Sequence, residues 1–259
     1  MYHPPEPTGN EVLISTNRDQ FEFVELKNVG PIALDLRDVR FTKGIDFDFA
    51  GSAIEILPPG EFVLIVKSLA AFETRYGTGL PVAGEYPDDN LENSGERLKL
   101  SFGAGTPIHD IDEYEDSAPW PVPADGSGFS LCLLDVDQVV SPDHDNPANW
   151  RMSRYTGGSP GADDILRYSD WKIVNGVTDD NADDDNDGLT TLMEFFLGGD
   201  PAVFSPERLP HGSIQTINVG GVNRDYLTLT FQRQIAADGT SHEVEFSTDL
   251  VNWTSDGVL

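Results

Sequence analysis

Short runs that alternate apolar and polar residues dominate the first 160 positions. Such runs occupy 21–30, 61–68, 96–102, 109–115, 129–137 and 149–154, and clusters of Gly, Pro or Asp separate them. Alternation with a period of two predicts half-buried strands, whereas the nearly continuous apolar run at 61–68 predicts a strand buried on both faces. A series of short strands divided by turns predicts a mainly β fold, a sandwich or a barrel.

Helical spacing is confined to three short segments, 68–77, 165–176 and 189–199. In the first, Ser68 stands where an N-cap is expected, apolar Leu69, Phe72 and Tyr76 follow at helical intervals, and Gly77 ends the pattern. The other two flank the most acidic part of the chain. Beyond them, alternation returns at 212–221, 225–234 and 242–253, with a turn at 236–240.

The Gly/Pro/Ser-rich stretch 155–164 predicts a domain boundary. We expect a β domain over 1–161, a helix-loop-helix linker over 162–202 and a β module over 203–259. The last part holds few strands for a closed sandwich, so we expect it to be partial.

The net charge of the chain limits the classes of partner that it could bind. The 259 residues include 45 Asp+Glu and 16 Lys+Arg, a formal net charge of -29, which argues against nucleic acid and anionic membrane surfaces and favours cations. No apolar run reaches the roughly 18 residues of a membrane span, so we expect no membrane insertion. A lone cysteine, Cys132, excludes an internal disulfide and a Cys-based zinc site, and its strand context predicts a small buried residue.

The stretch 183–194 has the spacing of an EF-hand-type calcium loop, D-x-[DN]-x-[DN]-G-x5-E. Its positions 1, 3, 5, 6, 7, 9 and 12 are Asp183, Asp185, Asp187, Gly188, Leu189, Thr191 and Glu194. Alternate carboxylates converge when the backbone coils around an ion, and Gly188 permits a sharp turn with positive φ. Leu189 would offer its carbonyl, Thr191 would hold a bridging water, and Glu194 would close the cage with both oxygens. The alternative is a solvated acidic linker.

Apolar residues on both sides of this loop favour two short helices that dock across it. Before the loop they are Tyr168, Trp171, Ile173 and Val174; after it they are Leu189, Leu192, Phe195 and Phe196. We therefore predict that this loop binds Ca²⁺, and that the neighbouring Asp179, Asp180 and Asp184 are solvated or outer-sphere.

The segment 168–201 also resembles the calcium-binding segments of large secreted bacterial proteins, which are related to dockerin and thrombospondin type 3 repeats. They share a short Trp-containing helix, a D-x-D-x-D-G-L loop and a helix ending in G-x-D-P; here the ending is "GGDP". The resemblance implies Asp183, Asp185, Asp187, the Leu189 carbonyl and Glu194 as ligands. The segment 226–253 is similar, over a shorter match, to a β module found after such segments.

Five segments of the first 161 residues carry a further resemblance; they are 21–41, 57–77, 92–102, 118–135 and 146–161, and they include "LPPGEFVLIVKS" and "APWPVPADGSGFSL". Through these segments, residues 1–161 resemble the lamin tail domain, an immunoglobulin-like β-sandwich. It implies a non-catalytic module of a secreted or surface protein, often joined to an enzyme, and a Met1 that is internal to a longer chain. The start of the sequence lacks the basic and apolar regions of a signal peptide.

Enzyme sites are the rival interpretation. The segment 109–116 offers His109, Asp110, Asp112, Glu113, Glu115 and Asp116, but a strand there would divide the acids between two faces. In 142–150, Asp143, His144 and Asp145 lie between prolines and predict a turn. No H-E-x-x-H or P-loop pattern occurs.

We therefore expect a non-catalytic structural or adhesive module of a secreted or cell-surface bacterial protein, with a joint stiffened by Ca²⁺. Its partners would be calcium, other domains of the same polypeptide, or surface and matrix components. The alternative is an accessory binding region of an extracellular hydrolase or kinase-like protein whose catalytic domain lies elsewhere. A self-contained metal-dependent hydrolase that uses 109–116 is a third hypothesis, which requires those side chains to converge in one pocket.

Overall fold

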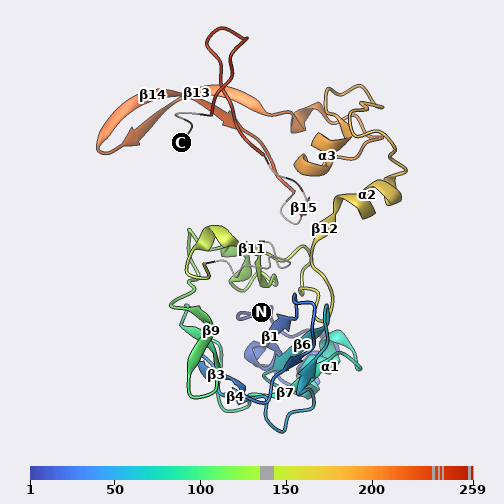
Figure 1. Ribbon diagram of the computed structural model, residues 1–259, viewed down its shortest axis with the longest axis vertical. Helices are drawn as coiled ribbons and strands as arrows, with labels where there is room; N and C mark the ends of the chain where they lie inside the picture. The colour runs from blue at the N-terminus through green and yellow to red at the C-terminus, as the bar shows by residue number, and fades with distance from the viewer. Residues whose placement is uncertain (135–142, 235–236, 239, 241, 256–257, 259) are drawn as a thin grey trace. The chain divides into compact units, whose positions relative to one another are not determined.

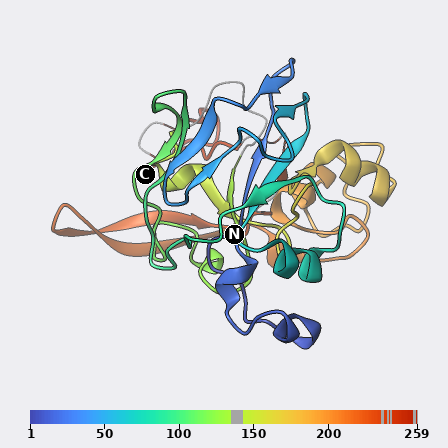
Figure 2. The same cartoon turned by 90° about the horizontal axis from the view of Figure 1, so that it is seen from below.

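The computed structural model of the protein (Figures 1 and 2) describes residues 1–134, 143–234, 237–238, 240, 242–255 and 258. The chain forms two compact units, Met1–Asp164 and Ile165–Leu259. Their boundary falls at the end of the Gly/Pro-rich stretch 155–164, whereas the further division predicted after residue 202 stays a prediction. The architecture is mainly β, with several small sheets, as the alternating pattern predicts.

The first unit contains the strands β1 to β11, one α-helix and four short 3₁₀ turns within its described residues. The strands are β1 (Phe23–Lys27), β2 (Leu34–Asp35), β3 (Val39–Lys43), β4 (Phe47–Asp48), β5 (Ile56–Leu57), β6 (Phe62–Val66), β7 (Val82–Glu85), β8 (Leu98–Phe102), β9 (Thr106–Ile111), β10 (Leu131–Leu133) and β11 (Trp150–Met152). The helix is α1 (Leu69–Tyr76), and the 3₁₀ turns are η1 (Gly9–Leu13), η2 (Arg18–Phe21), η3 (Val122–Ala124) and η4 (Pro147–Asn149).

Strand β6 is the most buried element of this unit. It lies between β1, which is antiparallel to it, and β7, which is parallel. Val63 and Ile65 belong to the main apolar core, whereas Leu64 and Val66 belong to a second cluster with Phe72 of α1. All four side chains have no exposed surface, so the prediction of a strand buried on both faces is confirmed.

A second sheet has the order β4-β3-β8-β9, with antiparallel pairing throughout. Its residues Val39, Phe41 and Leu100 share the main core with Val63 and Ile65 of β6. Burial of these apolar side chains from both sheets in one cluster is the principal hydrophobic stabilisation of the unit. The small pairs β2-β5 and β10-β11 lie outside the two larger sheets.

Helix α1 forms where the sequence predicts it. The Ser68 side chain accepts a hydrogen bond from Ala71 N, which caps the first turn, and Gly77 follows the last turn with φ of 87°. Phe72 is fully buried, and its ring lies 5.7 Å from that of Phe23 and 4.8 Å from that of Tyr76. The helix therefore covers the outer face of β1 and β6 and connects the parallel strands β6 and β7.

The second unit contains two helices, a long hairpin and short strands. These are β12 (Leu166–Arg167), α2 (Tyr168–Asn175), α3 (Thr191–Leu197), the 3₁₀ turn η5 (Pro206–Arg208), β13 (His211–Val219), β14 (Val222–Thr230) and β15 (Ala237–Asp238). Strands β13 and β14 form a twisted two-stranded ribbon (Figure 1), closed by Gly220 and Gly221 with φ of 63° and 83°. Two consecutive positive φ values are typical of a tight hairpin turn that only glycine adopts readily.

Two predicted strands differ from the structure. The strand expected at 109–115 begins earlier and ends at Ile111, because its partner β8 begins at Leu98, opposite Ile111. The strand expected at 242–253 is reduced, within the described residues, to a single bridge between Phe246 and Thr254. Of the strand expected at 129–137, β10 forms the middle, and residues 135–137 lie outside the described part. Among the described residues, no helix has the length and apolar character needed to cross a bilayer.

Candidate metal centre

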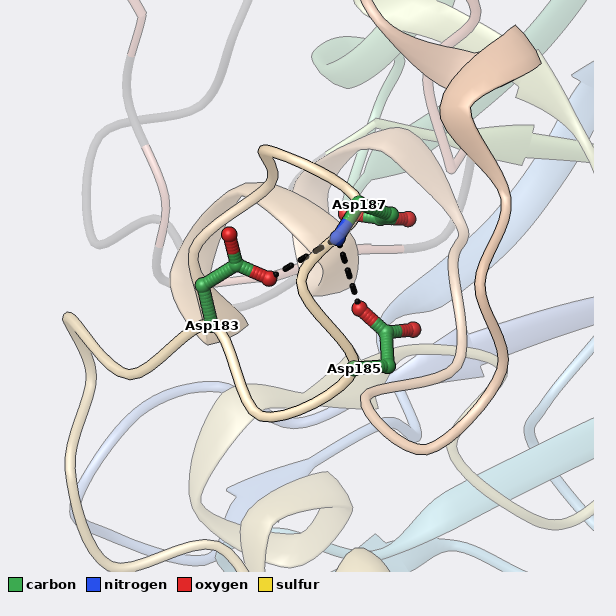
Figure 3. A group of neighbouring side chains, drawn as sticks. All are labelled: Asp183, Asp185 and Asp187. Atoms are coloured by element: carbon green, nitrogen blue, oxygen red, sulfur yellow. Dashed lines mark hydrogen bonds between the residues drawn. The ribbon is translucent and has the colours of Figure 1, made fainter.

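Three aspartates converge in the loop between α2 and α3. Asp183, Asp185 and Asp187 each place a carboxylate oxygen within 4.8 Å of the others, and they are the one such group of three or more His, Cys, Asp or Glu found in the described residues. Figure 3 shows the Asp183 and Asp185 carboxylates both pointing toward the backbone nitrogen of Asp187. The structure therefore contains a cluster that could hold a metal ion.

Backbone hydrogen bonds give the loop its coiled form. The Asp187 N–H donates to Asp183 Oδ1 at 3.1 Å and to Asp185 Oδ1 at 3.2 Å, and the Gly188 N–H donates to Asp183 Oδ2 at 3.1 Å. Gly188 has φ of 95°, which confirms the predicted need for glycine, and Asn186 has φ of 63°. The alternate spacing of the aspartates thus becomes a concave set of oxygens.

Glu194 is a buried acidic side chain with an unsatisfied carboxylate oxygen. It lies in α3 with 2% exposure, and its Oε1 is buried and receives no hydrogen bond from any residue that the structure describes; the same holds for Asp185 Oδ2. Burial, followed by the charges of Asp185 and Asp187, raises the pKa of Glu194 to about 7. Buried acceptors without a donor are costly, so these two oxygens lack the partner that a metal ion would supply.

Leu189 and Thr191 hold the loop against the start of α3. The Leu189 side chain is fully buried and its N–H donates to Asp187 Oδ1 at 2.8 Å. The Thr191 hydroxyl, predicted to hold a bridging water, donates to the Ala182 carbonyl at 3.2 Å, and the Thr191 N–H donates to the same oxygen at 2.8 Å. Thr191 therefore closes the loop directly, and its role toward an ion stays a prediction, as does that of the Leu189 carbonyl.

Aromatic packing joins the two helices on either side of the loop. The Phe195 ring lies 4.9 Å from Tyr168 and 5.4 Å from Trp171. Ile173 and Val174, which the sequence also places on this apolar face, are 79% and 84% exposed, so that expectation is wrong. Tyr168 and Trp171 are three residues apart, and both are partly buried against Phe195. They define the side of this two-turn helix that packs, which leaves positions 173 and 174 on other sides.

In α3, as in α2, only some of the predicted apolar residues pack between the two helices. Phe195 is 1% exposed and Leu189, just before the helix, is fully buried, whereas Leu192 is 41% exposed. Phe196 contacts the rings of Phe231 and His242 instead. The predicted apolar set therefore divides between the docking of the helices and contacts with the C-terminal part of the second unit.

Asp180 has a role that the sequence did not reveal. Its carboxylate accepts hydrogen bonds from the Tyr168 hydroxyl at 3.0 Å and from Lys172 Nζ at 2.5 Å. These bonds, with that of Lys172 first, lower the pKa of Asp180. Asp180 therefore bonds to α2, and its side chain is also 46% exposed; the prediction that it is solvated or outer-sphere stays a prediction.

The rival cluster at 109–116 does not converge. Asp110 and Asp112 both bind Arg97, at 2.8 Å and 3.0 Å, while Glu113, Glu115 and Asp116 are exposed. The His109 ring meets that of His144 at 4.7 Å, and burial, with the neighbouring His144, lowers the pKa of His109 to about 4. Trp120, at 5% exposure, packs in the main core.

The remaining candidate site residues make contacts that stabilise the fold. Residues 143–146 form a turn, as predicted, in which the Asp145 N–H donates to Asp143 Oδ1 at 3.1 Å. His3 bonds to Asp125 and Arg18.

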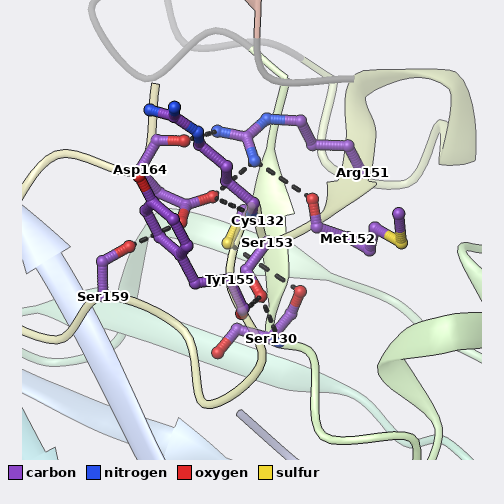
Figure 4. Close-up of polar contacts among 9 residues, drawn as sticks. Ser130, Cys132, Arg151, Met152, Ser153, Tyr155, Ser159 and Asp164 are labelled. Atoms are coloured by element: carbon purple, nitrogen blue, oxygen red, sulfur yellow. Dashed lines mark hydrogen bonds and ion pairs between the residues drawn. The ribbon is translucent and has the colours of Figure 1, made fainter. Parts of the chain in front are cut away.

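Cys132 lies in a polar network at the end of the first unit (Figure 4). There the buried Arg151 donates to Asp164 Oδ2 at 2.6 Å and to the Asp164 carbonyl at 3.1 Å. Cys132 is half-buried, and burial raises its pKa to about 12, so the thiol stays protonated at neutral pH.

Comparison of the chain with protein-family models, with curated proteins and with solved structures gives no match.

Proposed function

We propose that the loop 183–194 binds one Ca²⁺ ion through Asp183, Asp185, Asp187, the Leu189 carbonyl and Glu194, with Thr191 as a position for a bridging water. The observation that carries the proposal is Glu194, 98% buried on the helix that leaves the loop, with an Oε1 that no donor satisfies. Glu194 lies outside the group of three carboxylates within 4.8 Å of one another, but the charges of Asp185, Asp187, Asp200 and Asp183 all help to raise its pKa. A cation held by the loop would neutralise these charges and satisfy the buried oxygens.

The chemistry of the donors favours calcium over other metals. The candidate ligands are all oxygens, and the cluster contains no His or Cys, whereas zinc sites are usually built with nitrogen or sulfur ligands. Ca²⁺ accepts six to eight oxygens in a flexible arrangement, while Mg²⁺ demands a smaller and nearly octahedral one. A loop of irregular backbone with one bidentate glutamate suits the larger ion.

The ion would act on the fold rather than on a substrate. Without it, mutual repulsion of the aspartates opens the loop; with it, the ends of α2 and α3 are held together across the Tyr168–Phe195 contact. Extracellular calcium modules have Kd values of about 10⁻⁴–10⁻³ M. At ten times such a Kd, binding would stabilise this unit by about 1.4 kcal/mol.

For the chain as a whole, we propose a non-catalytic structural or adhesive module of a secreted or cell-surface bacterial protein. The core shared by β6 with β3 and β8 supports an immunoglobulin-like sandwich of the lamin-tail type for the first unit. The separation of the acids in 109–116 supports a non-catalytic role. The second candidate is an accessory binding region of an extracellular hydrolase or kinase-like protein.

Isothermal titration calorimetry of the full chain with CaCl₂ tests the metal site. We expect one ion per chain, and at least tenfold weaker binding for Asp185→Asn and for Glu194→Gln. Asp184→Asn is the matched control, because Asp184 is exposed in the same loop but lies outside the cage positions; its affinity stays within about threefold of the wild type. Absence of calcium heat, or full affinity in the Asp185→Asn/Glu194→Gln double variant, refutes the proposal.

A further inference from the structure

Asp187 differs from the other aspartates of the cluster because one of its carboxylate oxygens accepts a hydrogen bond from a residue outside the loop. Its Oδ1 accepts from the Leu189 N–H at 2.8 Å within the loop, whereas its Oδ2 accepts from the Ser205 N–H at 3.0 Å. Both residues are buried, Asp187 at 5% exposure and Ser205 at 7%. A single carboxylate thus joins the cluster to a segment eighteen residues later in the chain.

Ser205 belongs to the connector, which we define as residues 198–210, between α3 and β13. The connector contacts the rest of the unit through Ser205, which bonds to Asp187, and through Arg208 Nη1, which donates to the Leu197 carbonyl at 3.1 Å and to Gln232 Oε1 at 3.5 Å. Leu209 lies beside Gly188: a Cβ built on Gly188 would lie 3.7 Å from Leu209 Cδ2, so that side chain rests on the turn of the loop itself. Ser205 and Leu209 therefore attach the connector to the acidic loop.

Apolar burial does not hold the middle of the connector. Val203 and Phe204, the two residues before Ser205, are 54% and 61% exposed. The Ser205 hydroxyl donates to the Val203 carbonyl at 2.7 Å, which is a bond within the connector. At this point the Asp187–Ser205 hydrogen bond is thus the main attachment of the connector to the loop.

We propose that the calcium loop controls the order of the connector, with Asp187 as the positioning residue; this rests on the proposed function. Without a cation, carboxylate oxygens within 4.8 Å of one another repel, and rotation of Asp187 away from its neighbours relieves that repulsion. The same rotation removes the acceptor of the Ser205 N–H. A bound ion fixes Asp187, keeps Ser205 attached, and so holds the start of β13 at His211 beside the loop.

Hydrogen–deuterium exchange of the full chain, with calcium binding measured on the same sample by calorimetry, tests this coupling. We expect saturating Ca²⁺ to slow exchange at Ser205 and in 207–209 by at least tenfold, and to leave 218–223 at the hairpin tip within twofold. Mg²⁺ at equal concentration is the control for ionic strength. Calcium binding without any change at 205–209 overturns the coupling and leaves the metal site standing, whereas no calcium heat overturns both.

A pair of variants separates the backbone bond from the side chain. Ser205→Pro removes the N–H that Asp187 accepts, and Ser205→Ala keeps it and loses only the hydroxyl. We expect Ser205→Ala to bind Ca²⁺ within threefold of the wild type and to retain the calcium-dependent protection of 207–209. We expect Ser205→Pro to lose that protection and to bind Ca²⁺ more weakly by about the same factor, because the coupling is reciprocal. Wild-type protection in Ser205→Pro refutes the role of Asp187, and the wild-type exchange experiment decides the question if Ser205→Pro does not fold.

Discussion

Glu22 makes a contribution to the free energy of unfolding of the first unit that falls as the pH rises, which is unusual for a carboxylate. The side chain has no exposed surface; its Oε2 accepts from the Leu91 N–H at 2.9 Å and from the Tyr86 hydroxyl at 3.3 Å, while Oε1 is buried without a partner. Burial is the largest influence and raises the pKa of Glu22 to about 8. The folded protein therefore holds this proton at pH values where the unfolded chain has released it.

The sign and size of the effect follow from proton linkage. Between the ordinary pKa of 4.5 and the folded pKa of about 8, the unfolded state binds fewer protons, so the free energy of unfolding falls as the pH rises. The full penalty above pH 8 is about 5 kcal/mol at most, at 1.36 kcal/mol for each pH unit. Glu25, whose pKa burial raises to about 7, adds to the fall below pH 7. Between pH 7 and 8 the contribution of Glu22 alone is roughly 1 kcal/mol.

Urea denaturation at pH 7.0, 7.5 and 8.0 measures this slope in wild type and in Glu22→Gln. Replacing Trp171 and Trp253 by Phe in both leaves Trp120 and Trp150, so that fluorescence reports on the first unit. Relative to Glu22→Gln, we expect the wild type to lose roughly 1 kcal/mol over this range. The comparison between the two proteins is needed because burial lowers the pKa of the Met1 amino group to about 6, which raises stability with pH in both. The exposed Glu61→Gln is the matched control and keeps the wild-type slope. Equal slopes in the wild type and Glu22→Gln would show that Glu22 does not hold this proton.

Two further predictions concern the first unit, with stability measured in the same way. Asp164→Ala leaves the guanidinium of Arg151, which is 2% exposed, without its carboxylate, so we expect the free energy of unfolding to fall by about 3–5 kcal/mol. Asp163→Ala removes a carboxylate with 39% side-chain exposure and should lower it by less than about 1 kcal/mol. Equal losses of stability in the two variants would contradict the role described for the Arg151–Asp164 ion pair. Phe72→Ala should cost about 3–5 kcal/mol because it empties a fully buried site, and Leu69→Ala, at 37% exposure, less than half as much; a loss below about 1 kcal/mol in Phe72→Ala contradicts the packing described for α1.

The sequence was sufficient to predict the elements that depend only on residues close together in the chain. Ser68 and Gly77 bracket α1 because capping depends on residues within the first and last turns. The apolar run of β6 is continuous because main-core residues lie on one face and α1 on the other. The calcium-loop spacing likewise placed Asp183, Asp185 and Asp187 together, since alternate positions of a coiled loop converge whatever the rest of the fold does.

Contacts between distant segments account for what the sequence did not reveal. The exposed positions of Ile173 and Val174 depend on which side of α2 meets Phe195, and a helix of eight residues allows several choices. The end of β9 at Ile111 depends on where β8 begins. The Asp187–Ser205 hydrogen bond joins residues with no shared pattern, so no spacing rule could have indicated it.

A crystal structure of the full chain grown with Ca²⁺, with anomalous difference density collected for the ion, shows whether the loop 183–194 holds calcium. We predict one anomalous peak in this loop, about 2.3–2.6 Å from carboxylate oxygens of Asp183, Asp185, Asp187 and Glu194 and from the Leu189 carbonyl. A loop without a peak at saturating Ca²⁺, or an ion held there without Glu194, would contradict it.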